Sequence, residues 1–305
     1  MNWSVVITTR NRAAMLRRAI ESCIKQTMAC EVVVVDEAST DDTPNVVSQY
    51  PGVVYIRNEQ PLGHPGAANK GLNAAHGDWI KPVDDDDWLA PNCISALDGA
   101  VSIALARGKN PVIASGRSVN VDEHEAILGE TRQLDPGLVC LPSRQLLEMM
   151  MIEQAPIGTP VQVGHSRAAA IACGGWNADR TIKSLYGDEV ELWIKLARLG
   201  DAVFLPDIIS YRTIWDQGHA ASATPSMRFG WNMQLKQMIA QSLNTSVQPA
   251  VQSFLALHWG LVALKDKKVS ESIPLLGKAL TQPSSFKLFI DQRKMRQVKP
   301  LLEHL

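Results

Sequence analysis

Four consecutive aspartates, Asp84 to Asp87, carry the most specific chemical signal in this chain of 305 residues. They directly follow Trp79–Val83, an apolar run typical of a buried strand. Adjacent carboxylates repel one another, and side chains alternate along a strand, so Asp84 and Asp86 are expected to share one face. Two such oxygen ligands suit Mg²⁺ or Mn²⁺ shared with substrate phosphates. The alternative is a solvated acidic turn that caps the next helix.

Another carboxylate, Asp36, ends a second predicted strand, Glu31–Asp36, in the same way. It could accept hydrogen bonds from a nucleotide base or from ribose hydroxyls. In open α/β sheets, ligands bind beyond the carboxyl ends of the strands, where both Asp36 and the aspartate run fall. The alternative role for Asp36 is a helix cap, although Asp41 or Asp42 already suits that role.

The elements that must position these carboxylates alternate between strand and helix over residues 1–115. The predicted strands are Trp3–Thr9, Glu31–Asp36, Val53–Arg57, Trp79–Val83 and Val112–Ser115. The predicted helices are one capped by Asn11 and running through Met15–Ile24, one starting at Asp42-Thr43-Pro44, and the segments Pro65–Ala75 and Pro91–Arg107. This order predicts an α/β fold with a mostly parallel central sheet and helices on both faces.

Residues 116–224 have a mixed pattern. It includes a Met-rich helix at Leu146–Ile152, a turn at Gly174–Trp176 and an acidic helix start near Asp188. After Thr224 the pattern is helical. We therefore predict one domain over residues 1–224, with halves at 1–115 and 116–224, followed by a C-terminal helical region over residues 225–305.

Composition narrows the class of protein. Hydrophobic residues make up 46% and charged residues 20%, which is typical of a globular chain, and the formal net charge of -1 gives no field that would attract nucleic acid. Five cysteines without a CxxC pair, no signal peptide and no apolar run long enough to span a bilayer favour a cytoplasmic protein. The first strand is not followed by G-x-G-x-x-G, which argues against a dinucleotide-binding oxidoreductase.

Four ordered blocks resemble a known family: VVITTRNR, VVVVDEASTDDT, the stretch from Asn58 to Ile80, and PVDDDDW. Over roughly the first 220 residues, the chain resembles the inverting GT-A-fold glycosyltransferases of family 2. The resemblance implies that residues 1–115 bind a nucleotide sugar and that residues 116–224 hold the acceptor. It also implies that Asp36 contacts the base, Asp84 the ribose or the metal, and Asp86 the divalent ion.

The chain departs from the family pattern around the expected diphosphate. Thr8 and Arg10 stand where the family usually has Pro and Tyr, and Ala68 replaces the Arg of an Ala-Arg-Asn triplet. A cation that faces the diphosphate is therefore expected from Arg10 or Lys70. The full set of residues expected to bind the donor is Thr8, Arg10, Asp36, Asn69, Lys70, Asp84 and Asp85.

The second half is expected to supply the general base. GGWNADRTIKSLYGDEVELWIKLARLG resembles the acceptor-side segment of the family, with Glu189 at the usual Asp base and Asp188 just before it. An inverting transfer needs a carboxylate that deprotonates the acceptor hydroxyl, and the residues alone do not choose between the two. The alternative is an acidic pair favoured by a helix N-terminus. The resemblance also makes His219 a candidate contact of the metal or diphosphate, unless it is an ordinary loop residue.

The expected function is therefore metal-dependent transfer of a sugar, with a UDP-sugar favoured as donor, to a glycan, a lipid-linked molecule or another hydroxyl acceptor in polysaccharide or glycoconjugate biosynthesis. The alternatives are a nucleotide-sugar-binding relative with little catalysis and a nucleotidyltransferase. A basic C-terminal stretch could contact anionic lipid beside a lipid-linked acceptor, or form a solvated face. Its residues are Lys287, Arg293, Lys294, Arg296 and Lys299.

Overall fold

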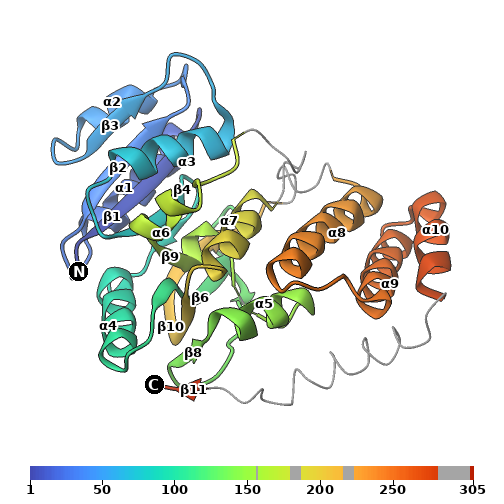
Figure 1. The fold of residues 1–305 in the computed structure, drawn as a ribbon. Coiled ribbons are helices and arrows are strands. Elements are labelled where there is room, and N and C mark those ends of the chain that lie inside the picture. The colour runs from blue at the N-terminus through green and yellow to red at the C-terminus, as the bar shows by residue number, and fades with distance from the viewer. Residues whose placement is uncertain (156, 179–186, 216–222, 281–302) are drawn as a thin grey trace.

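A computed structural model describes residues 1–155, 157–178, 187–215, 223–280 and 303–305. One sheet runs through the molecule in the order β11-β8-β10-β6-β9-β4-β1-β2-β3, with β5 paired to β10 and β7 paired to β6 (Figure 1). The first half contains β1 (Trp3–Thr9), α1 (Ala13–Ile24), β2 (Glu31–Asp36), α2 (Thr43–Ser48), β3 (Val54–Arg57), α3 (Gly63–Ala74), β4 (Trp79–Asp84), β5 (Trp88–Leu89) and α4 (Cys93–Ala106). The predicted α/β fold is confirmed.

The four strands β3, β2, β1 and β4 pair in parallel, and helices cover both of their faces. Alternation along β1 explains the two layers. Val6 belongs to the core cluster that includes Ala67 and Leu72 of α3, whereas its neighbour Val5 packs in the cluster that includes Leu16 of α1 and Ile94 of α4. Each strand therefore stabilises helices on opposite faces through successive residues.

The register of these strands gathers the predicted donor residues at one edge of the sheet. Thr8 lies opposite Asp84 across β1 and β4, and Thr9 lies opposite Asp36 across β1 and β2. All four residues are the last or next-to-last of their strands. The carboxyl ends of the parallel strands therefore bring Thr8, Asp36 and Asp84 to one edge of the sheet.

The start of α1 differs from the prediction. Asn11 does not cap the helix but lies in the left-handed region, with φ 54°, and its side chain accepts a hydrogen bond from the Thr40 amide at 2.7 Å. The helix begins at Ala13, whose amide donates to Asp41 at 3.0 Å. Asp41, on the loop after β2, thus satisfies the helix terminus from outside it, which sequence spacing along α1 could not reveal.

The predicted strand Val112–Ser115 is part of the longer β6, and the second half adds further strands that the sequence pattern did not reveal. It contains β6 (Pro111–Val121), β7 (Ile127–Glu130), β8 (Val139–Leu141), α5 (Ser143–Met151), a 3₁₀ turn (Pro160–Gln162), β9 (Val163–Ser166), α6 (Arg167–Ala172), α7 (Asp188–Ala197) and β10 (Asp201–Thr213). The strand β9 lies between β4 and β6 and is antiparallel to both. The strand β10 runs parallel to β6 and ends at Thr213, beside the aspartate run.

The C-terminal region is helical, with α8 (Pro225–Ser242), α9 (Pro249–Lys265) and α10 (Val269–Leu280). Its residues build a separate apolar cluster that includes Phe229, Phe254 and Leu275. The short strand β11 (Glu303–His304) pairs with β8, which the prediction of an all-helical region missed. Within the described residues, no helix is long and apolar enough to cross a membrane.

Candidate active site

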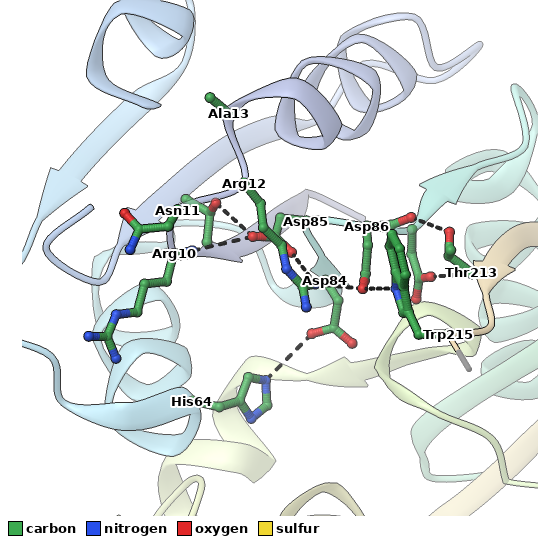
Figure 2. A network of polar contacts seen from close by, with 12 residues as sticks. Arg10, Asn11, Arg12, Ala13, His64, Asp84, Asp85, Asp86, Thr213 and Trp215 are labelled. Atoms are coloured by element: carbon green, nitrogen blue, oxygen red, sulfur yellow. Dashed lines mark hydrogen bonds and ion pairs between the residues drawn. The ribbon is translucent and has the colours of Figure 1, made fainter. Parts of the chain in front are cut away.

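The aspartate run leaves β4 at Asp84 and turns along the edge of the sheet (Figure 2). Because the strand ends there, strict alternation does not govern the three aspartates that follow. The Asp85 carboxylate accepts hydrogen bonds from the Thr9 hydroxyl at 2.7 Å and from the Arg10 amide at 3.3 Å. Asp87 accepts the Thr213 amide at 2.8 Å. These two buried aspartates tie the turn to the ends of β1 and β10.

Asp86 contacts cationic and polar groups from two distant parts of the chain, around the start of α1 and the end of β10. One guanidinium nitrogen of Arg12 lies 2.6 Å from its Oδ2 and 3.1 Å from Asp85 Oδ1. The indole of Trp215 donates to the same Asp86 Oδ2 at 2.8 Å. The Asp86 carbonyl accepts Arg18 at 2.7 Å and the Thr213 hydroxyl at 2.5 Å. The carboxylate of Asp86 is thus held at the open edge rather than turned into the core.

The run carries more negative charge than its surroundings offset. Burial raises the pKa of Asp85 to about 6, although Arg12 opposes the shift. Burial and the charges of Asp84 and Asp86 hold the pKa of Asp87 well above its usual value. Burial likewise raises the pKa of Asp84. A divalent cation would relieve this repulsion. Mg²⁺ is usually bound by one or two carboxylates of the protein together with phosphates of the substrate. The predicted ligands Asp84 and Asp86 offer carboxylate oxygens of the kind that such an ion binds.

No group of three or more His, Cys, Asp or Glu side chains in the described residues could hold a metal by itself. The candidate third contact, His219, lies outside the described residues.

His64, on the first turn of α3, joins this edge to the second half of the chain. Its Nδ1 lies 2.8 Å from Asp188 Oδ2, and its Nε2 lies 3.7 Å from Asp84 Oδ1. The imidazole also meets Trp176 edge-on, with ring centroids 4.9 Å apart. A pocket between α3 and the sheet is lined by His64, Asp84, Trp176, Thr8, His165 and apolar neighbours. Thr8, a predicted donor residue, thus lies at the predicted edge.

The acidic pair at the start of α7 has two different environments. Burial acts to raise the pKa of Asp188, but the hydrogen bond and charge of His64 outweigh it and lower that pKa to about 2. Burial raises the pKa of Glu189 to about 8, and the neighbouring Asp188 adds to the shift. Asp188 is therefore ionised beside His64 at neutral pH, whereas Glu189 holds its proton up to about pH 8.

The remaining predicted donor residues have intramolecular partners. Asp36 is fully buried and accepts the Tyr55 hydroxyl at 2.6 Å and the Ser39 amide at 2.8 Å. Because Asp36 is 0% exposed, a nucleotide could contact its side chain only if that side chain became uncovered. Lys70 donates to Asn58 at 2.6 Å.

Two further donor candidates differ in where they point. The amide of Asn69 donates to the Trp176 carbonyl at 2.7 Å and accepts from the Trp176 amide at 2.8 Å. It thereby holds the predicted Gly-Gly-Trp turn on α3. The side chain of Arg10 is exposed and extends away from the aspartate run in Figure 2. Trp176 is only 3% exposed and so anchors this turn.

Three residues of the site were not predicted as functional: Arg12, His64 and Trp215. Arg12 and His64 fall inside the blocks VVITTRNR and Asn58–Ile80, so their position was a weak signal. Trp215 follows the end of β10 and had no signal, because that strand was not recognised.

Comparisons with known proteins show which proteins this chain resembles. The family model described as "Glycosyl transferase family 2" matches residues 4–128. The succinoglycan biosynthesis protein ExoO of Rhizobium meliloti is 36% identical over 136 residues, which is 42% of this chain and 39% of that protein. The GalNAc(5)-diNAcBac-PP-undecaprenol beta-1,3-glucosyltransferase of Campylobacter jejuni is 35% identical over 100 residues, 31% of this chain and 32% of that protein. The chain thus spans about two fifths or less of these relatives.

Solved structures share the fold over nearly the whole chain. TarS of S. aureus (residues 1-349) in complex with UDP-GlcNAc has a TM-score of 0.60 and 19% identity, covering 98% of this chain and 82% of that one. The mannosyltransferase PcManGT of Pyrobaculum calidifontis, in complex with GDP-Man and Mn²⁺, has a TM-score of 0.59 and 18% identity, covering 96% and 80%. The fold and the family match together define a glycosyltransferase of the GT-A fold. Within that class, residues 4–128 are similar to glycosyl transferase family 2.

Proposed function

We propose that this chain transfers a sugar from a nucleotide diphosphate sugar to an acceptor hydroxyl, with inversion, and that Asp84 and Asp86 hold a divalent cation for it. The observation that carries the proposal is the position of His64. Its two ring nitrogens lie 3.7 Å from Asp84 and 2.8 Å from Asp188. A carboxylate pair on the donor side and another on the acceptor side therefore meet at one site, as a single-displacement transfer requires.

The leaving diphosphate carries negative charge, and positive groups on the donor side must offset it. A bound divalent cation would polarise the diphosphate and stabilise its developing charge. Among the protein's own cations, Arg12 is better placed than Arg10 or Lys70 for this task, because its guanidinium already lies against Asp85 and Asp86. We propose that Arg12 faces the diphosphate when the donor binds.

On the acceptor side, we assign Glu189 as the general base. A base must be ionised yet basic, and its ideal pKa lies near the working pH. The pKa of Glu189, about 8, meets this condition, whereas the pKa of Asp188, about 2, makes it a weak base. When the surroundings push the pKa values of two neighbouring carboxyls apart, the two carboxyls take different roles in acid–base catalysis. Asp188 then holds His64, and Glu189 takes the proton of the acceptor hydroxyl.

We favour a UDP-sugar as donor, and the complexes of TarS with UDP and UDP-GlcNAc support this choice. The complex of PcManGT with GDP-Man and Mn²⁺ supports a divalent ion, and it is the reason to test GDP-sugars as donors as well. The names of the relatives favour a lipid-linked acceptor and polysaccharide biosynthesis. The basic stretch predicted to contact a membrane, Lys287 to Lys299, lies outside the described residues, so that contact rests on the sequence alone.

The test is release of nucleoside diphosphate from a panel of UDP- and GDP-sugars, with glycan and lipid-linked acceptors, in Mn²⁺ and in EDTA. We expect turnover of at least one donor, dependent on Mn²⁺ and increased by an acceptor. Donor binding without turnover would show a non-catalytic sugar-nucleotide-binding protein. Pyrophosphate release from nucleoside triphosphates, with no turnover of any sugar nucleotide, would show a nucleotidyltransferase.

A further inference from the structure

The first turn of α7, which carries the acidic pair, has few polar tethers among the described residues. Asp188 is the first residue of the helix and follows Gly187, whose φ is 85°. From outside the helix, His64 contacts Asp188 at 2.8 Å, and the Asn177 amide donates to Glu191 at 3.0 Å. Val190 in this turn is only partly buried against the core, and the fully buried apolar anchors of α7 begin at Leu192 and Trp193.

His64 is itself held firmly, because α3 is docked on the sheet without spare room. A Cβ added at Gly71 would lie 2.2 Å from Val6 of β1. The same helix presents Asn69, whose amide makes two hydrogen bonds to the Trp176 backbone. The imidazole packs edge-on against the buried Trp176 ring. A rigid helix on the donor side therefore aims one side chain at the acceptor-side helix.

We propose that His64 is the positioning residue of the transfer reaction: through Nδ1 it fixes Asp188, and thereby sets Glu189 at the acceptor hydroxyl in register with Asp84. The inference rests on the function proposed above, and it adds a residue that acts through Asp188. A carboxylate can only accept a hydrogen bond, so Nδ1 carries the proton of this contact. The longer contact from Nε2 to Asp84, at 3.7 Å, aligns the ring with the donor edge.

Two substitutions distinguish the contact made by Nδ1 of His64 from the contact made by Nε2. The amide nitrogen of asparagine stands at the same bond distance from the backbone as histidine Nδ1, and that of glutamine stands at the distance of Nε2. His64→Asn therefore keeps a donor for Asp188 and loses the contact with Asp84. His64→Gln does the reverse, so the pair is a matched test of which contact positions the base.

In transfer assays, we expect His64→Asn to stay within about threefold of wild-type kcat. We expect His64→Gln to lose about ten- to a hundredfold, since a displacement on the order of 1 Å costs about that much. The affinity for the donor nucleotide, measured by calorimetry, should stay within about twofold in His64→Gln, because the loss lies on the acceptor side. Equal losses in both variants, or a loss confined to donor affinity in His64→Gln, would refute the assignment.

A second measurement is independent of catalysis. Amide hydrogen exchange at Glu191, whose amide donates to the Gly187 carbonyl at 3.0 Å, reports on the first turn of α7. Exchange there should be about tenfold faster in His64→Gln than in His64→Asn or wild type. Unchanged exchange in both variants would overturn the inference even if transfer is observed. A wild-type protein without transfer would overturn the proposed function, while the exchange result would still decide the role of His64.

Discussion

At the scale of single residues, Asp86 is one of the two carboxylates that we propose as ligands of the divalent cation. Its Oδ2 already accepts Arg12 and Trp215. In Asp86→Asn the amide oxygen can still accept from these donors, but the negative charge that would bind a cation is lost. We expect the affinity for UDP in the presence of Mn²⁺ to fall about ten- to a hundredfold, the scale of a lost charge-assisted contact, in a calorimetric titration.

The matched control is Asp207→Asn, a change of the same type at an exposed residue of β10. It should leave the affinity unchanged. Equal affinity in Asp86→Asn and wild type, with and without Mn²⁺, would remove Asp86 from the cation site.

The assigned base predicts a pH dependence. Burial and the neighbouring Asp188 raise the pKa of Glu189 to about 8, so below that pH the carboxyl is mostly protonated and cannot accept a proton. The rate of transfer should therefore rise about tenfold per pH unit toward pH 8 and then level off. A pH profile of kcat/KM measured with saturating Mn²⁺ gives the inflection. An inflection near 4.5, the ordinary pKa of glutamate, would mean that the buried Glu189 is not the base.

How far the residues of the site could be predicted depended on whether their partners lie close in sequence. Asp84, Asp86, Asp188 and Glu189 were predictable, because a carboxylate at the end of a strand or start of a helix signals its own location. The groups that organise them were not, because each reaches across the fold. Arg12 lies 73 residues from Asp85, His64 lies 124 from Asp188, and Trp215 lies 129 from Asp86.

At the scale of elements, the contact between α3 and the turn at Gly174–Trp176 depends on Asn69. Its amide satisfies both the amide and the carbonyl of Trp176. Asn69→Ala would leave these buried groups unpaired, and we expect it to lower the free energy of unfolding by about 1–3 kcal/mol in urea denaturation. The affinity for the nucleotide should stay unchanged. A stable variant with weakened UDP binding would instead support the role in donor binding predicted from the sequence.

The strands of the first half were predictable because buried parallel strands are continuous apolar runs. Those of the second half were not. The strand β10 contains Pro206 and shifts register against β6 between Phe204 and Ile208, which breaks the pattern of a strand. The strand β9 has only four residues and includes Gly164 and His165. Both pair with segments distant in sequence, and only the assembled sheet shows their place.

At the scale of the whole molecule, the two halves share one core. A single apolar cluster contains Val33 of β2, Leu72 of α3 and Trp193 of α7. It also contains Ile239 of α8, so the C-terminal region packs on the same body through its first helix. This shared packing explains how an acidic pair on α7 reaches the sheet edge that bears Asp84. The two halves are therefore packed as one body around the proposed site.

The central claim is that this one site transfers a sugar with donor groups from the first half and a base from the second. Its most direct test is turnover of Glu189→Gln at saturating donor, Mn²⁺ and acceptor, with donor affinity measured in parallel and Asp188→Asn as the comparison. We predict that Glu189→Gln lowers kcat by about two to four orders of magnitude, the usual worth of a general base, and leaves donor affinity unchanged. A loss of less than about tenfold in Glu189→Gln, or full activity there with a large loss in Asp188→Asn, would contradict the account.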